Sequence, residues 1–128
     1  MKFKYEELEI WQIALQLIKT IYKILRKFPQ DEKYDLVSQG KRAVTSIALN
    51  IAEGSGCHTD KDFSLFINRA ITSLLEVDAV LKIGINLGYL LDSEYRNVEP
   101  LIKEEYFKLI AFDKTLLRDP AKRRRYKK

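Results

Sequence analysis

Residues 42–56 read RAVTSIALNIAEGSG. Val44, Ile47 and Ile51 lie three or four residues apart, which is the spacing of the apolar face of an amphipathic α-helix. Two glycines close the stretch, and helices commonly end at a glycine because glycine adopts the left-handed conformation without steric strain. The stretch therefore predicts a helix over about residues 34–53 that ends at these glycines.

The same helical period continues along most of the chain, and no stretch of useful length alternates as a β-strand does. Three further helices are expected, joined by short links. Four helices of this kind predict an all-α fold, an antiparallel up-and-down four-helix bundle. The further helices begin near Glu6, near Thr59 or Asp60, and near Ser93 or Asn97, and the first and last of them end near Phe28 and Leu117.

A polar line runs along the second predicted helix beside its apolar face, and the third helix carries a matching line. A turn centred near Cys57 would place Ser46 opposite Arg69, and Arg42 is expected to pair with Glu76. This pattern predicts either a polar seam that fixes the register of the two helices or an Asn–Glu ligand site at the end of the bundle. The predicted seam comprises Arg42, Ser46, Asn50, Glu53, Arg69, Ser73 and Glu76.

The third helix also carries a second apolar stripe, well away from its main one. A single core does not need both stripes, so the second predicts a subunit interface of a homo-oligomer. The alternative is that this helix is the most central one and packs on two sides. The predicted interface residues are Leu65, Val80, Ile83 and Leu87 of this helix, together with Leu49, which points away from the inward face of the second helix.

Positive charge is concentrated at the end of the chain. Residues 122–128 hold six of the 23 Lys and Arg residues, which leaves 17 basic against 18 acidic residues elsewhere. This division predicts a bundle domain of residues 1–119 and a basic tail of residues 120–128. A basic tail favours a polyanion such as nucleic acid, although it could also be a solvated end that aids solubility. The candidate nucleic-acid-binding residues are Lys122, Arg123, Arg124, Arg125, Lys127 and Lys128, and the next basic cluster is Lys19, Lys23, Arg26 and Lys27.

Several chemistries are disfavoured by what the sequence contains. The single histidine, His58, cannot supply the two Glu-x-x-His motifs of a di-iron bundle, and Cys57 beside it is a weak zinc signal. No catalytic motif is visible, so neither an enzyme nor a cofactor is expected. Asp78 lies at the edge of the core stripe of the third helix, so its side chain is expected to form a bond to another helix rather than to take part in catalysis. One cysteine and the lack of a long apolar run predict a cytoplasmic protein that does not enter a membrane.

Three segments resemble the four-helix-bundle family of 23S ribosomal RNA intervening-sequence proteins. They are ELEIWQIALQLIKTIYKI (7–24), FPQDEKYDLVSQGKRAVTSIALNIAEGSG (28–56) and NRAITSLLEVDAVLKIGINLGYL (68–90). The resemblance covers about residues 5–91. It implies a bacterial protein that assembles as a ring-shaped homopentamer and has no established catalysis. A more distant relative, the accessory variability determinant of diversity-generating retroelements, binds a reverse transcriptase and nucleic acid.

The resemblance also assigns positions. Gln39 matches the family pattern and joins the polar seam, whereas Gly40 stands where a bulky residue is expected and weakens the helix by up to about 1 kcal/mol. Two functions follow as hypotheses. The first is a non-enzymatic homo-oligomer that binds RNA or a nucleic-acid complex through basic residues. The second is an adaptor ring that holds a protein partner, such as a reverse transcriptase, without recognising nucleic acid itself.

Overall fold

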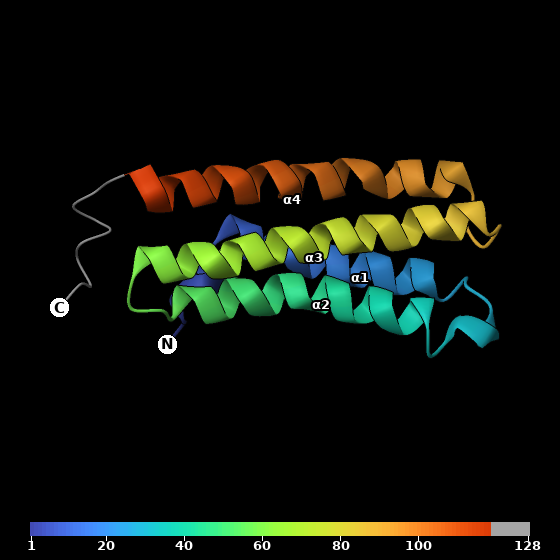
Figure 1. Cartoon of the computed structure of the whole chain (residues 1–128), viewed down its shortest axis with the longest axis horizontal. Coiled ribbons are helices and arrows are strands. Elements are labelled where there is room, and N and C mark those ends of the chain that lie inside the picture. The colour runs from blue at the N-terminus through green and yellow to red at the C-terminus, as the bar shows by residue number, and fades with distance from the viewer. Residues whose placement is uncertain (119–128) are drawn as a thin grey trace.

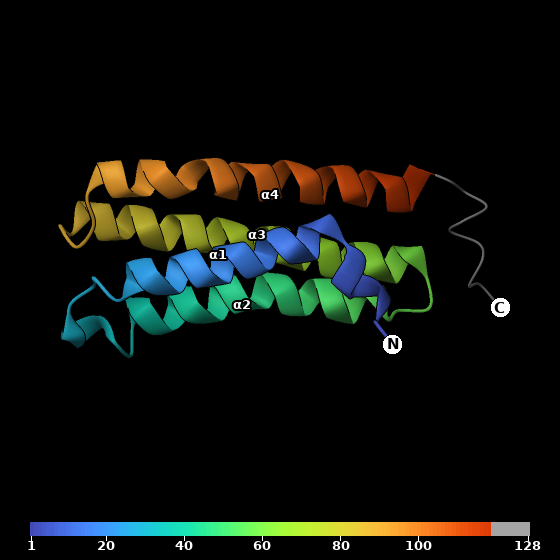
Figure 2. The same ribbon diagram turned by 180° about the vertical axis from the view of Figure 1, so that it is seen from behind.

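The structure, a computed structural model, describes residues 1–118. All regular secondary structure in these residues is helical, which confirms the expected all-α chain with four long helices. The four helices lie side by side and are joined at their ends by short connections (Figures 1 and 2). Two short 3₁₀-helices, η1 and η2, precede α1 and α2. The elements are η1 (Lys4–Glu7), α1 (Glu9–Leu25), η2 (Gln30–Glu32), α2 (Leu36–Ser55), α3 (Asp60–Asn86) and α4 (Asp92–Arg118).

The core lies between the helices and is built from their inward stripes. On α3, Ile67, Ala70, Leu74, Val77 and Leu81 recur every three or four residues, and each is at most 1% exposed. Burying a Leu or Ile side chain contributes about 1.5–3 kcal/mol. Because each helix supplies such a stripe, the apolar period that predicts the helices also accounts for how they are held together.

The end of α3 is set by a left-handed glycine. Gly88 has a φ of 81°, the only positive φ in residues 1–118. The Tyr89 N–H donates to the Gly84 carbonyl over 2.8 Å, and the Gly88 N–H donates to the Ile85 carbonyl over 3.0 Å. These two bonds form a Schellman motif, which satisfies carbonyl groups that the helix end would otherwise leave unpaired.

The glycines at the end of α2 have a different role from the expected one. Gly56 has a φ of −89°, so the expectation of a left-handed glycine at this end is wrong. Gly54 lies inside the helix and is buried. A Cβ at Gly54 would lie 2.7 Å from the Phe63 ring and 2.8 Å from the Phe66 Cβ, both on α3. Gly54 is therefore needed because α2 and α3 approach each other closely there.

Gly40 allows a second close approach, between α1 and α2. A Cβ at this position would lie 2.9 Å from a Leu25 methyl group and 3.4 Å from a Val80 methyl group. The small residue that departs from the family pattern thus makes room for the Leu25 side chain in the core. Its packing offsets the weak helix propensity of glycine.

Candidate functional surfaces

The centre of the predicted seam is a chain of hydrogen bonds between α2 and α3. The Asn50 side-chain amide donates to the Ser46 carbonyl over 2.8 Å and to the Ser46 hydroxyl over 2.9 Å. The Ser73 hydroxyl, from α3, lies 2.9 Å from the Ser46 hydroxyl and donates to it. All three side chains are half-buried. Each bond contributes about 0.5–1.5 kcal/mol, and the Ser46–Ser73 bond ties the register of the two helices.

That register differs from the expected one by one helical turn. Ser46 meets Ser73 rather than Arg69. Helical side chains lean toward the N-terminus of their own helix. On α2 this lean carries a side chain away from the α2–α3 connection, whereas on α3 it carries a side chain toward the connection. An α2 side chain therefore contacts an α3 residue that is later in the sequence than the α3 residue whose Cα lies at the same height along the bundle.

Three charged or polar residues lie beside these hydrogen bonds and remain exposed to solvent. Gln39, Arg42 and Glu76 are exposed, and they line a surface hollow together with Ser46 and Ser73. No ion pair joins Arg42 to Glu76 within the described part of the chain. The expected pair is thus not made inside one subunit, and a pair across a subunit interface stays a prediction.

The other two predicted seam residues lie apart from the centre. Arg69 is exposed, and its guanidinium lies 4.8 Å from the centroid of the Phe66 ring, a cation–π arrangement. Glu53 is exposed, and its carboxylate forms no ion pair with any residue in 1–118. Asn50 donates to Ser46 rather than toward Glu53. The structure therefore brings together Ser46, Asn50 and Ser73 and gives no support to an Asn–Glu ligand site.

Four of the five predicted interface residues are exposed. Their exposed fractions are 57% for Leu49, 55% for Leu65, 45% for Ile83 and 49% for Leu87. Leu65 and Ile83 are five helical turns apart and so lie on one line along α3, which Leu87 continues one turn later. We call these four exposed side chains the α2–α3 apolar face; the exposed charged residues Arg69 and Glu76 lie between Leu65 and Ile83 on the same side of α3.

Val80 does not belong to that face. Its side chain is only 3% exposed and lies in the core. A Val80 methyl group lies next to Gly40 on α2, 3.4 Å from where a Cβ of that residue would be, which is an ordinary packing distance. The helix period alone placed Val80 away from the main stripe, but packing against the neighbouring helix buries it. Val80 is therefore removed from the predicted interface.

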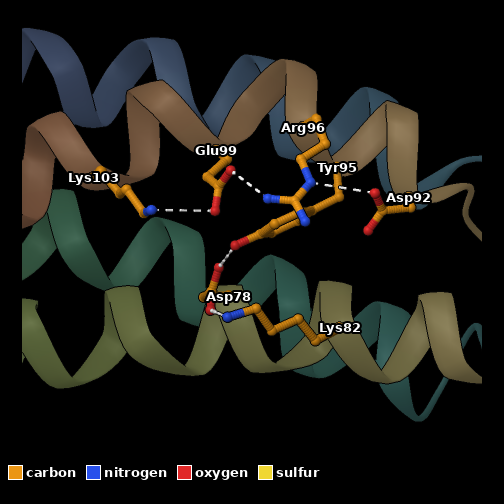
Figure 3. A network of polar contacts seen from close by, with 7 residues as sticks. All are labelled: Asp78, Lys82, Asp92, Tyr95, Arg96, Glu99 and Lys103. Atoms are coloured by element: carbon orange, nitrogen blue, oxygen red, sulfur yellow. Dashed lines mark hydrogen bonds and ion pairs between the residues drawn. The ribbon is translucent and has the colours of Figure 1, made fainter.

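Asp78 bonds between helices, as its position predicts. Figure 3 shows Tyr95 extending from α4 toward Asp78 on α3. The Tyr95 hydroxyl donates to the Asp78 carboxylate over 2.6 Å, and the Lys82 ammonium lies 2.8 Å from the other carboxylate oxygen. Burial, together with the hydrogen bond to Asp78, raises the pKa of Tyr95 to about 12. This arrangement is a structural bridge with no group poised to react.

A second set of charges runs along the surface of α4 (Figure 3). Arg96 lies 3.2 Å from both Asp92 and Glu99, and Lys103 lies 3.3 Å from Glu99. These pairs are three or four residues apart on one helix. Exposed pairs with this spacing stabilise a helix by about 0.2–0.5 kcal/mol each.

Glu105 is a buried carboxyl group without a hydrogen-bond partner. Its side chain is 0% exposed, and neither carboxyl oxygen has a partner in residues 1–118. Burial raises the pKa of Glu105 to about 8, and the nearby charges of Glu104 and Glu9 add to this rise against the opposing effect of Lys108. The sequence contains a signal for it, because Glu105 falls on the inward stripe formed by Val98, Ile102 and Leu109. Sequence reasoning missed it.

The loop cysteine is not an activated nucleophile. Burial raises the pKa of the Cys57 thiol, and the charges of Asp62 and Glu53 raise it further. A raised pKa keeps the thiol protonated, whereas the thiolate is the reactive form. No group of three or more His, Cys, Asp or Glu side chains in residues 1–118 is arranged to hold a metal ion.

The predicted tail residues fall outside the described residues, so their assignment stays a prediction. In residues 1–118 no helix has both the length and the apolar character that crossing a bilayer requires. The tail residues concerned are Lys122, Arg123, Arg124, Arg125, Lys127 and Lys128.

Comparison with known proteins places this arrangement in one family. Residues 6–111 match the family described as 23S rRNA-intervening sequence protein. The match begins before α1 and extends into α4, so it includes the seam, the α2–α3 apolar face and Glu105, but not the basic tail. No curated protein was found to be similar to the chain.

Proposed function

We propose, because the chain belongs to the family of 23S rRNA-intervening sequence proteins, that it is a non-enzymatic, homo-oligomeric helical protein that binds RNA. In this proposal the four helices form an antiparallel up-and-down bundle over residues 1–119. The bundle assembles as a homopentameric ring in the bacterial cytoplasm. Residues 120–128 are a basic tail that contacts nucleic acid.

The observation that carries the assembly is the α2–α3 apolar face. Leu49, Leu65, Ile83 and Leu87 are about half exposed although each is a large apolar side chain. Exposed apolar surface of this kind marks an interaction site. A second subunit on this face would also cover the hollow that holds Arg42 and Glu76, where a charged partner from that subunit could pair with either.

A ring needs two different faces on each subunit, because only a head-to-tail contact can close with five copies. The α2–α3 apolar face would be one. A second exposed apolar pair, Leu75 of α3 and Phe107 of α4, is available as the other, with exposed fractions of 54% and 65%.

The proposed RNA contact rests on charge. The six basic residues of the tail are brought together in a pentamer, which would gather about 30 positive charges in one assembly. Each phosphate that these charges neutralise releases counterions, so binding should weaken steeply with added salt. Contacts to phosphates carry no sequence information, so affinity should vary little with RNA sequence.

Assembly is tested by measuring the molar mass of the protein by light scattering. Ile83→Glu places a charge on the α2–α3 apolar face and should give a folded but smaller species. Leu15→Glu is the matched control, because Leu15 is 46% exposed and Ile83 45%, and Leu15 lies on α1. A monomeric wild-type protein, or an equal effect of both substitutions, would contradict the proposed interface.

RNA binding is tested by comparing the full chain with one that ends at Asp119. The shorter chain retains every described helix, so it should fold normally and lose most of its RNA affinity. Equal affinity of the two chains at physiological salt would mean that the tail is only a solvated end.

The adaptor function is the alternative, and the near-neutral body of the chain favours it. Residues outside 122–128 carry 17 basic and 18 acidic residues, so they do not attract a polyanion as a whole. An adaptor should be purified without nucleic acid, whereas an RNA-binding ring should carry it. The ratio of absorbance at 260 and 280 nm in purified protein distinguishes the two.

A further inference from the structure

One face of α1 carries an excess of positive charge. Residues 10–30 contain four basic residues and no Asp or Glu. Lys19, Lys23 and Arg26 are exposed, and none of them forms an ion pair with another residue in 1–118. The fourth, Lys27, pairs with Glu94 of α4. A local excess of this kind is notable because the chain without its tail is almost neutral.

The spacing of these residues makes a row along one side of the bundle. Lys19 and Lys23 lie on α1 and Lys27 lies two residues past its end, so the row extends over about 12 Å along the helix direction. All three line one surface hollow between α1 and α4, which also includes Asn97, an amide that can donate hydrogen bonds, and Glu94, the carboxylate that pairs with Lys27.

A second hollow on the other side of Lys19 extends the face toward α2. It is lined by Tyr22 and Arg26 among others. The ammonium of Lys41, from α2, lies 5.2 Å from the centroid of the Tyr22 ring. A partly exposed aromatic ring and two further cations therefore lie beside the row.

We propose that this α1 basic face is a contact surface for the phosphate backbone of RNA, separate from the basic tail. The inference rests on the proposed RNA-binding function and locates part of it on the bundle. A row of cations along one side of the bundle matches a linear polyanion, whose charges repeat along its length. A compact anion would instead need donors that converge on one point, and Lys19 and Lys27 diverge along the helix.

An anionic membrane is a poorer match for the same charges. Helices that lie on membranes bury a broad apolar face in the lipid. On this face Leu15 is the one large apolar side chain of α1 that is mostly free of neighbours, at 46% exposed, while Ile18 and Tyr22 are half-buried against the bundle.

The α1 basic face lies far from Arg118, the last described residue before the tail. Lys27 pairs with Glu94, near the start of α4, whereas the tail follows Arg118 at its other end. These two positions are about 36 Å apart along α4. The views in Figures 1 and 2 agree, because the end of α4 lies beside the start of α1. The two basic regions can therefore be altered independently.

The test uses the full chain and a fluorescein-labelled single-stranded RNA of mixed sequence, with fluorescence anisotropy as the readout. The variant is Lys19→Gln/Lys23→Gln/Arg26→Gln. The control is Lys4→Gln/Lys61→Gln/Lys114→Gln, which changes the net charge equally at exposed lysines outside the α1 basic face. Circular dichroism verifies that both remain helical.

The slope of log affinity against log salt concentration has a magnitude of about 0.7 per phosphate contact on a single strand. Losing three contacts should therefore reduce the magnitude of this slope by about 2. The same loss weakens binding about 50-fold at about 150 mM salt, and the control should lose much less. If the wild-type chain binds no RNA, the proposed function fails together with this inference. If the wild-type chain binds RNA and the variant matches the control, only this inference is overturned. It is also overturned if the variant retains RNA binding but loses binding to phosphatidylserine vesicles.

Discussion

The buried carboxyl of Glu105 should make the protein less stable as the pH rises from 5 to 8. Below pH 4.5 the group is protonated in both the folded and the unfolded chain, so it does not affect the pH dependence. Between pH 4.5 and about 8 the unfolded chain releases this proton while the folded chain keeps it. Unfolding is therefore favoured increasingly as the pH rises, and above about pH 8 the effect becomes constant.

The size of the effect follows from the shift in pKa. A rise from 4.5 to about 8 corresponds to about 5 kcal/mol of lost stability once both forms are ionised, because each unit of pKa is worth about 1.4 kcal/mol. Between pH 5 and pH 8 the change is about 3–4 kcal/mol. This is a large part of the total stability of a domain, which is about 5–15 kcal/mol.

The perturbation is Glu105→Gln, which keeps the shape of the side chain and removes its titration. Urea denaturation followed by the fluorescence of Trp11, the single tryptophan, gives the free energy of unfolding at each pH. Protein concentration must be held constant, since the proposed assembly would also stabilise the folded chain. The difference between wild type and variant should change by about 3–4 kcal/mol from pH 5 to pH 8, in favour of the variant at high pH.

Glu104→Gln is the matched control, because Glu104 is the adjacent carboxylate and is exposed. It should retain most of the pH dependence of the wild type, because the charge of Glu104 raises the pKa of Glu105 less than burial does. Parallel curves for wild type and Glu105→Gln between pH 5 and pH 8 would refute the reasoning. They would show that the Glu105 carboxylate is hydrated or paired in the folded protein.

Three further substitutions test the packing and the bond between α3 and α4 by denaturation. Gly54→Ala should destabilise the protein by about 1–3 kcal/mol, because the new methyl group meets Phe63; an unchanged midpoint would show that α2 and α3 separate easily. Gly88→Ala should cost about 1 kcal/mol, because its φ of 81° strains any residue with a Cβ; no loss would mean that the turn rearranges. Tyr95→Phe should lower the free energy of unfolding by about 1.5–3 kcal/mol, because Asp78 loses a hydrogen bond. Between pH 10 and about 12 the wild type should lose stability, because Tyr95 ionises in the unfolded chain while its raised pKa keeps it protonated in the folded one. Tyr95→Phe should abolish this loss, and a variant that still shows it would contradict the assignment.

The sequence by itself determined the four long helices and most of the inward residues of α2, α3 and α4. On α1 it offers two apolar stripes, and only the structure shows that Ile13, Leu17 and Ile21 are buried while Leu15 is 46% exposed. The sequence information is local, because the spacing of apolar residues is compared only with the period of one helix. The same spacing places Glu105 on the inward stripe and leaves one face of α1 without acidic residues. Both features are readable before any packing is known, although the burial of Glu105 was not anticipated.

Tertiary structure alone decided which residues of different helices meet. Ser46 bonds to Ser73 rather than facing Arg69, because side chains lean along their helices and shift every contact between α2 and α3. Val80 is buried next to Gly40 of α2, although the helix period places it away from the main stripe of α3. Such pairings depend on the shapes of two surfaces at once, and the period of one helix contains no information about the shape of the other.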